Sequence, residues 1–328
     1  MNLTEFADTL NKQMKDDDAA VGILSETANV DEWLSTGSIV LDYLTGGGVP
    51  VTRIVEIYGD ESTGKSLIAA QIAASAQDED YTVLYIDTES AISKEIMEAV
   101  GVNVDEILYT EPDTMEQVFK IIDGAIDIST KNGNKLLIIW DTIAATSTES
   151  ELKADFGSST MGIHARTMSQ GLRKLARKMS KSNVAAVFIN QVRDKIGVMY
   201  GEKSDTFGGR AMKFYTSVRI KLNKGSKIYD SKKSVIGHKT RVEITKNKVG
   251  PPFRNAEIFI YFGHGIDDNE TTFQFLKDSE IITGGAGGNW ILNLDFGTPV
   301  KFKTNNWDKI YEKYYEDIEN LLFGEYDE

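Results

Sequence analysis

The sequence has no cysteine among its 328 residues, and its three histidines, His164, His238 and His264, lie far apart. The missing cysteines exclude disulfides, thiol catalysis and cysteine-based metal sites, and the scattered histidines argue against a histidine metal site. No apolar run approaches the roughly 18 residues that span a membrane. The first 18 residues lack the apolar core of a signal peptide. These absences predict a cytoplasmic protein without a membrane partner.

Positive charge is also scarce, because 36 Lys and Arg stand against 50 Asp and Glu, a net charge of −14. This balance argues against a simple basic protein that coats nucleic acid. The acidic residues gather at residues 16–18 and 316–328, whereas the segment 166–254 is rich in Lys and Arg. A segregated basic region can still bind nucleic acid, because the asymmetry between segments is the informative quantity.

One stretch carries a recognisable phosphate-binding pattern. The apolar residues 54–58 predict a buried strand, GDESTGKS fits G-x-x-x-x-G-K-[ST], and an Ala-rich helix follows over 67–76. Glycines let the backbone point N–H groups at phosphate oxygens, Lys65 supplies charge for the β- and γ-phosphates, and Ser66 offers a hydroxyl to Mg²⁺. A Gly-rich turn that precedes a helix by chance is the less favoured interpretation. The predicted nucleotide-binding residues are Gly59, Asp60, Glu61, Ser62, Thr63, Gly64, Lys65 and Ser66.

Three further predicted strands end in polar side chains, which would face the ligand crevice of a parallel α/β sheet. Glu89 is a candidate for polarising the attacking water, although a surface carboxylate at a strand end is the alternative. Asp141 would hold the Mg²⁺ shell opposite Ser66, as a Walker B aspartate does. Gln191 could sense the state of the nucleotide. The three strands cover residues 81–90, 136–140 and 184–192.

The segments around this core have less specific patterns. In residues 1–30, apolar residues at helical spacing predict an amphipathic helix, which is either a frayed terminus or a helix that docks on another copy of the chain. Residues 150–163 predict a loop, and the basic helix after them has either a solvated face, the commoner case, or a phosphate-contacting one. Residues 193–215 predict a long irregular stretch, residues 216–266 predict antiparallel strands, and a domain boundary is expected near 267.

The ordered motifs resemble the bacterial RecA recombinase family from about residue 36 to residue 266. The resemblance implies an α/β fold with a RecA-type P-loop ATPase core, in which helices flank a mainly parallel sheet. It also implies an N-terminal arm for docking between subunits (1–33), the core (34–266) and a small C-terminal α/β domain with an acidic tail (267–328). The motifs are STGSIVLD, RIVEIYGDESTGKS, YIDTESA, LYTEPDT, LLIIWDTIAA, STMGIHARTMSQGLRKLA, VFINQVRDKIGVMYG, TFGGRAMKFYTSVRI and TRVEITKNKVGPPF.

The resemblance also implies roles for individual residues, with ATP and Mg²⁺ as cofactors. Glu89 matches the glutamate that activates water, and Gln191 matches the glutamine that couples the γ-phosphate to a DNA loop. Lys246 and Lys248 match lysines that reach the γ-phosphate bound by a neighbouring subunit. The catalytic set is then Lys65, Glu89, Gln191, Lys246 and Lys248; Asp141, Thr142 and Phe262 join the nucleotide-binding residues; Ser66 and Asp141 hold the metal; and Lys213, Phe214 and Arg219 match subunit-interface positions.

The implied function is ATP-dependent assembly of a helical filament on single-stranded DNA, followed by pairing and strand exchange with homologous double-stranded DNA. Two loops, about residues 151–163 and 192–210, would line the DNA. Ser93 and Ile96 depart from the residues that hold adenine in the family, which suggests a divergent member, for example one encoded by a phage. The residues that match DNA-contacting positions are Met161, Gly162, Arg166, Arg173, Ile196, Gly208, Gly209 and Arg210.

Two other functions remain open at this level. A ring-shaped helicase of the same core fold would translocate along DNA, but the KNK motif at 246–248 and the MGIHAR segment favour the recombinase. A scaffold that binds nucleotide without hydrolysing it is the second alternative. The presence of Glu89, Asp141 and Gln191 argues against the scaffold.

Overall fold

The computed structural model describes residues 2–14, 21–23, 30–155, 162–194, 204–294 and 298–324. The chain forms two compact units, Met1–Glu32 and Trp33–Glu328. The first contains helix α1 (Leu3–Met14), which confirms the predicted amphipathic helix. Leu3, Phe6 and Met14 are exposed, so the apolar face of this helix is uncovered.

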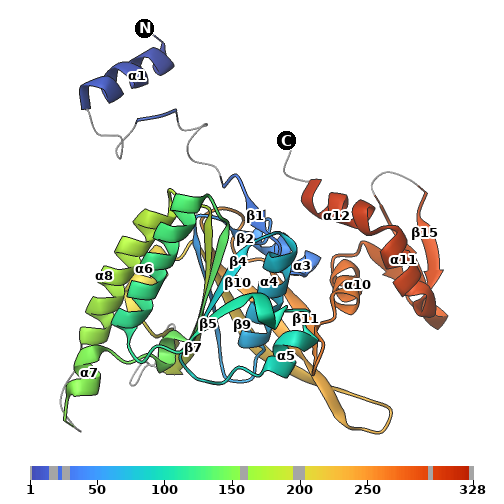
Figure 1. Ribbon diagram of the computed structural model, residues 1–328. Helices are drawn as coiled ribbons and strands as arrows, with labels where there is room; N and C mark the ends of the chain where they lie inside the picture. Colours follow the sequence, from blue (N-terminus) through green and yellow to red (C-terminus); the bar gives the residue numbers. More distant parts are fainter. Residues whose placement is uncertain are drawn as a thin grey trace. The chain divides into compact units, whose positions relative to one another are not determined.

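A ten-stranded sheet, as counted over the described residues, organises the second unit (Figure 1). In the spatial order given below, each strand from β9 to β5 pairs in parallel with its neighbour. The strands from β12 to β9 pair antiparallel with their neighbours, and β8 pairs antiparallel with β7. The predicted α/β class, with a parallel core and appended antiparallel strands, is confirmed. In spatial order the strands are β12 (Gly265–Ile266), β11 (Asn255–Tyr261), β10 (Val235–Asn247), β9 (Val218–Tyr229), β3 (Ile54–Gly59), β7 (Val184–Asp194), β6 (Leu136–Asp141), β4 (Thr82–Asp87) and β5 (Ile107–Thr110), and β8 (Ser204–Thr206) pairs with β7.

Helices cover both faces of the parallel strands, because alternate residues of each strand point to opposite faces. On β6, Leu136, Ile138 and Trp140 belong to one apolar cluster, and Leu137 and Ile139 belong to the other. Strands buried on both faces read as continuous apolar runs, as these do. One face packs against α6 (Met115–Asn132), α8 (Ile163–Met179) and α9 (Gly209–Tyr215), and the other against α3 (Ile39–Thr45), α4 (Lys65–Asp78) and α5 (Lys94–Ala99).

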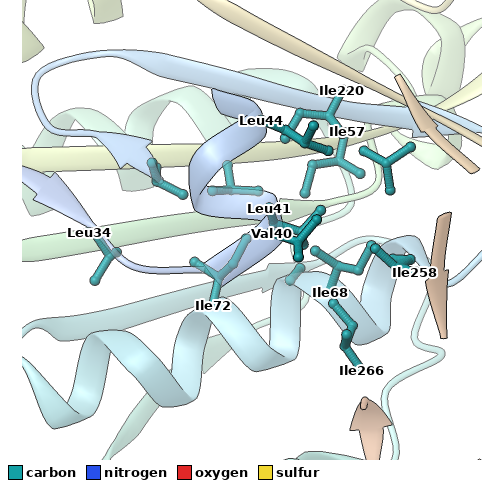
Figure 2. Packing of buried hydrophobic residues seen from close by; sticks show 14 of the residues in the cluster. Leu34, Val40, Leu41, Leu44, Ile57, Ile68, Ile72, Ile220, Ile258 and Ile266 are labelled. Atoms are coloured by element: carbon teal, nitrogen blue, oxygen red, sulfur yellow. The ribbon is translucent and has the colours of Figure 1, made fainter. Parts of the chain in front are cut away.

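The larger cluster holds the phosphate-binding segment in place. Figure 2 shows Leu41 and Leu44 of α3 together with Ile57 of β3 and Ile68 of α4, all of them buried. Burying one such side chain contributes about 1.5–3 kcal/mol. Both elements that flank the loop 59–66 are therefore fixed by packing.

Two local predictions need correction. Residues 150–163 are not all loop, because a capping box on Thr148 starts the short helix α7 (Glu149–Lys153). The stretch 193–215 is not all irregular either, since it contains β8 and α9.

The C-terminal segment packs against the core. It contains α10 (Asp268–Asp278), the sheet of β13 (Ile282–Gly284), β14 (Asn289–Leu292) and β15 (Val300–Lys303), and helices α11 (Trp307–Lys313) and α12 (Tyr315–Phe323). A two-stranded sheet, β1 (Trp33–Leu34) with β2 (Val49–Pro50), flanks α3. The segment lies in the same compact unit as the core, so a separate domain from residue 267 stays a prediction. Along the described ranges, no helix has the length and apolar character needed to cross a membrane.

Candidate functional site

The loop between β3 and α4 is shaped by two glycines. A Cβ on Gly59 would lie 2.3 Å from the carbonyl oxygen of Leu222, so only glycine lets β3 approach β9 here. Gly64 has φ +93° and caps the N-terminus of α4, where a Cβ would lie 2.5 Å from Ile260 Cδ1. The loop therefore directs its backbone toward the start of a 14-residue helix, an arrangement that binds phosphate.

Lys65 is buried at the first position of α4. Its ammonium donates to the carbonyl oxygens of Gly59 at 3.1 Å and Asp60 at 2.7 Å. Burial lowers the pKa of Lys65, and the nearby charges of Asp141 and Glu89 oppose that shift. The ammonium thus lies within the loop, where a phosphate would bind.

Four predicted residues line one cavity of about 480 Å³, namely Lys65, Ser66, Glu89 and Asp141. Gln191 also lines the cavity, and its amide donates to Glu89 Oε1 at 2.7 Å. Lys65 and Ser66 begin α4, whereas the other three lie in β6 and β7 or just after β4, which are neighbours in the parallel sheet. The structure therefore brings together the strand-end residues that the sequence singled out.

The turn that carries Glu89 is held by Asp87. The Asp87 carboxylate accepts N–H bonds from Glu89 at 3.0 Å, Ala91 at 3.1 Å and Ile92 at 3.2 Å. The hydroxyl of Tyr109 also donates to it at 3.1 Å. Burial raises the pKa of Glu89, and the charge of Asp141 adds to the rise.

Asp141 is buried at the end of β6. Burial raises the pKa of its carboxyl, and hydrogen bonds from Ser66 and Tyr85 oppose the rise. The Tyr85 hydroxyl lies 2.9 Å from Asp141 Oδ2. Thr142, the next residue, donates through its hydroxyl to the carbonyl of Ile189 at 2.9 Å, which joins β6 to β7.

These oxygen donors fit Mg²⁺. The ion takes oxygen ligands and usually binds through one or two protein groups, substrate phosphates and waters. Ser66 and Asp141 supply such groups side by side. Within the part of the chain that the structure describes, no cluster of three or more acidic, His or Cys residues could form an all-protein cage. The site therefore suits an ion shared with a bound nucleotide.

The residues expected near a nucleobase are more open. Ser93 caps the N-terminus of α5 through its side chain, and Ile96 and Phe262 are exposed. The ring of Phe262 lies 5.9 Å from that of His238, whose Nε2 atom is buried without a hydrogen-bond partner. Sequence reasoning did not single out His238 as part of this region, since an isolated histidine in a strand gives no signal.

Lys246 and Lys248 contact the carboxyl end of α9. The ammonium of Lys246 donates to the carbonyls of Lys213 at 2.5 Å and Thr216 at 2.6 Å, and that of Lys248 donates to Phe214 at 3.0 Å. Burial lowers the pKa of Lys246 to about 8, and the charge of Lys248 adds to the shift. Both lysines thus donate hydrogen bonds to the last carbonyl groups of α9, which a helix leaves without partners of its own.

Arg219, predicted at a subunit interface, is buried inside this subunit. Its Nε donates to Glu56 at 2.5 Å, and its Nη2 lies 3.2 Å from Thr206 Oγ1. Asn190 donates to Glu56 Oε1 at 2.9 Å and to the carbonyl of Phe207 at 2.8 Å. This network holds the chain after β8 next to β7. In the isolated subunit, Arg219 therefore stabilises the fold.

The predicted DNA-contacting residues lie partly in described segments. Gly162 and Gly208 cap the N-termini of α8 and α9 with left-handed φ, and Gly209 follows with φ +56°. Arg166, Arg173 and Arg210 are exposed. Met161 and Ile196 lie outside the described residues.

Part of the basic face of α8 serves the fold. Lys178 Nζ lies 2.6 Å from Asp123 Oδ1 and 2.7 Å from Asp127 Oδ1, and Lys174 Nζ lies 2.8 Å from Asp123 Oδ2. These pairs join α8 to α6. These two lysines therefore serve to hold α8 against α6.

The fold and the loop define a P-loop nucleotide-binding protein of the α/β class. The family model described as RecA N-terminal domain matches residues 5–267. Protein RecA of Gluconobacter oxydans is 43% identical over 257 residues, which cover 78% of this chain and 70% of the relative. Protein RecA of Clostridioides difficile is 43% identical over 258 residues, 78% of this chain and 72% of the relative. Protein RecA of Levilactobacillus brevis is 40% identical over 274 residues, 81% of this chain and 70% of the relative.

The chain therefore belongs to the RecA family. The resemblance read from the motifs is confirmed, and membership favours a function in recombination over the ring helicase and the scaffold.

Proposed function

We propose that this protein is a DNA-dependent ATPase that assembles on single-stranded DNA and promotes pairing and strand exchange with homologous double-stranded DNA. The observation that carries the proposal is the Gln191–Glu89 hydrogen bond of 2.7 Å in the cavity that Lys65, Ser66 and Asp141 also line. A RecA-family chain with this set has both a hydrolytic site and a polar link from it to a DNA loop. We assign it to the cytoplasm.

The residues divide the work of phosphoryl transfer between them. Bound ATP would supply the phosphoryl group, and Mg²⁺ would offset its charge. Lys65 would exchange its carbonyl partners for phosphate oxygens, while Ser66 and Asp141 would hold the metal shell. Glu89 would orient and deprotonate the attacking water, a role that its position in the lining of the same cavity allows.

Gln191 would report the state of the site to the DNA. Its strand, β7, runs on to Asp194 at the start of the predicted loop 192–210. A nucleotide that draws Gln191 away from Glu89 would shift the base of that loop. ATP then acts as a switch that favours the DNA-binding arrangement, and hydrolysis releases it.

Assembly would complete the site. In their own subunit, Lys246 and Lys248 bond carbonyls at the end of α9 and do not line the cavity around Lys65. In a filament they would reach the γ-phosphate held by a neighbouring copy, with Lys213 and Phe214 beside them. Phe214 is 67% exposed, which suits an apolar side chain that a neighbouring copy would cover.

We assign the docking surface for the apolar face of α1 to the core of a neighbouring copy. A groove of about 760 Å³ lies between β5 and α6, lined by apolar side chains that include Leu108, Ile121 and Ile128. Leu108 is 55% and Ile128 63% exposed. An amphipathic helix with Leu3 and Phe6 uncovered suits such a groove on a second copy.

The replacement Lys65→Ala tests the proposal. It should abolish nucleotide-dependent binding of a labelled single-stranded oligonucleotide, measured by fluorescence anisotropy with ATP and Mg²⁺. The exposed Lys131→Ala is the charge-matched control and should bind like the wild type. ATP-dependent filaments of the Lys65→Ala variant in electron micrographs would contradict the phosphate-loop assignment.

A further inference from the structure

Behind the cavity, a tyrosine hydroxyl contacts the carboxylate assigned to the metal shell. Tyr85 of β4 is fully buried, and its hydroxyl donates to Asp141 Oδ2 at 2.9 Å. Tyr85 does not line the cavity, whereas Asp141 does. The tyrosine therefore contacts the site through Asp141 and is not itself part of the cavity wall.

The sheet fixes this contact. β4 pairs in parallel with β6, with Tyr85 opposite Ile139 and Asp87 opposite Asp141. The ring of Tyr85 belongs to the larger hydrophobic cluster, and Asp87 and Tyr109 also lie near its hydroxyl. A hydroxyl buried there is costly unless it finds a partner, and the aspartate is that partner.

The second hydrogen-bond donor to Asp141 is Ser66. Under the proposed function, on which this inference rests, the Ser66 oxygen would be a ligand of Mg²⁺. Tyr85 would then remain as a hydrogen-bond donor to Asp141. A bond from a neutral donor to a carboxylate is strong and directional, so it restricts rotation of the carboxylate.

We propose that Tyr85 is a positioning residue that fixes the Asp141 carboxylate by bonding one oxygen and leaving the other for the metal shell. Such outer contacts orient metal ligands in proteins generally, and their loss typically costs ten- to a hundredfold in metal affinity. Nothing in the sequence pattern marks this role, because Tyr85 reads as one more residue of a buried strand.

The test removes the hydroxyl with Tyr85→Phe and measures binding of fluorescently labelled ADP as MgCl₂ is raised. The half-saturating Mg²⁺ concentration should rise about tenfold, as expected for loss of a hydrogen bond to a charged group. Binding of the same ADP in EDTA should not change. A merely structural role would weaken ADP binding in EDTA as well as in MgCl₂.

Tyr58→Phe is the matched control. It also removes a buried hydroxyl near the loop, but that hydroxyl lies 2.9 Å from Thr245 Oγ1 rather than at Asp141. Its Mg²⁺ dependence should equal that of the wild type. In the Asp141→Asn background, the Tyr85→Phe change should cause no further shift, because the carboxylate it acts through is gone.

Three outcomes decide the matter. A tenfold shift confined to Tyr85→Phe supports the inference. Unchanged Mg²⁺ dependence in Tyr85→Phe, or an undiminished shift in the Asp141→Asn background, overturns it while the proposed function stands. A wild type whose ADP binding ignores Mg²⁺ overturns the metal assignment of the proposed function, and this inference with it.

Discussion

At the scale of single residues, the proposed hydrolysis of ATP depends on Glu89. Its carboxylate lines the cavity opposite Lys65 and is oriented by the Gln191 amide. Glu89→Gln keeps the shape and removes the base, so ATP hydrolysis should fall about a hundredfold or more while nucleotide binding stays intact. Steady-state phosphate release and equilibrium ATP binding measure the two effects.

The exposed Glu98→Gln, on nearby helix α5, is the control and should hydrolyse ATP normally. Normal turnover in Glu89→Gln would rule Glu89 out as the residue that activates water.

A second residue-scale prediction concerns Gly64. Gly64→Ala forces a left-handed φ of +93° on alanine and places its Cβ 2.5 Å from Ile260 Cδ1. The strain alone costs about 1–2 kcal/mol of unfolding free energy, and the displaced loop should also weaken ATP binding. Denaturant unfolding and nucleotide titration measure both.

Gly124→Ala is the control, because it adds the same methyl group at a glycine where there is space for it. Gly124 lies within α6, and no atom is within 4 Å of its added Cβ. The substitution should stabilise the protein by about 0.5–1 kcal/mol and leave ATP binding alone. Equal effects of the two alanines would show that the conformation of Gly64 does not matter.

At the scale of elements, α3 is tied to the chain before it by a buried carboxyl. Asp42 accepts bonds from Thr36 N at 2.8 Å, Thr36 Oγ1 at 2.6 Å and Ser35 Oγ at 2.7 Å. Burial raises the pKa of Asp42 from 3.8 to about 7; these hydrogen bonds oppose the rise, and the charge of nearby Asp268 adds to it.

The sign of the pH dependence follows from this shift. The folded state binds more protons at Asp42 than the unfolded state between its ordinary pKa of 3.8 and about 7. The unfolding free energy that protonated Asp42 contributes is complete below its ordinary pKa of 3.8. It is lost as pH rises through the raised pKa of about 7. Relative to Asp42→Asn, the wild type should therefore lose unfolding free energy between pH 5 and pH 8.

Denaturant unfolding of both proteins at the two pH values measures this difference, with the exposed Asp105→Asn as control. Parallel pH profiles for the wild type and Asp42→Asn would contradict a raised pKa.

Elements differ in how well the sequence predicts them. The strands of the parallel sheet were predictable because two buried faces demand continuous apolar runs, and Thr114 before α6 forms the capping box that such a start favours. Helices α7 and α9 were missed, because five and seven residues carry too little periodicity to outweigh the surrounding Gly and Ser.

The site divides in the same way. Motif residues such as Lys65 and Asp141 follow from spacing and strand ends. Tyr85 and the burial of Arg219 depend on which strands become neighbours, and strand order is set by packing across the whole sheet. Local sequence does not contain that information.

At the scale of the whole molecule, the proposed docking of α1 between copies uses the groove between β5 and α6. Ile128→Asp places a charge on this exposed apolar surface. Docking of α1 from the next copy would then bury an unpaired carboxylate, which is costly. The variant should therefore form no filaments in electron micrographs, while ATP binding by the single subunit stays unchanged.

Thr130→Asp, exposed on the same helix but outside the groove lining, is the control and should assemble normally. Filaments of normal length from Ile128→Asp would place the docking surface elsewhere.

The central claim is that one cavity hydrolyses ATP under the control of DNA. The most direct test is the rate of ATP hydrolysis with and without single-stranded DNA, at low and at moderate salt. The account predicts strong stimulation by single strands that declines as salt rises, because phosphate contacts supply the DNA affinity. A rate indifferent to DNA at every salt concentration would contradict it.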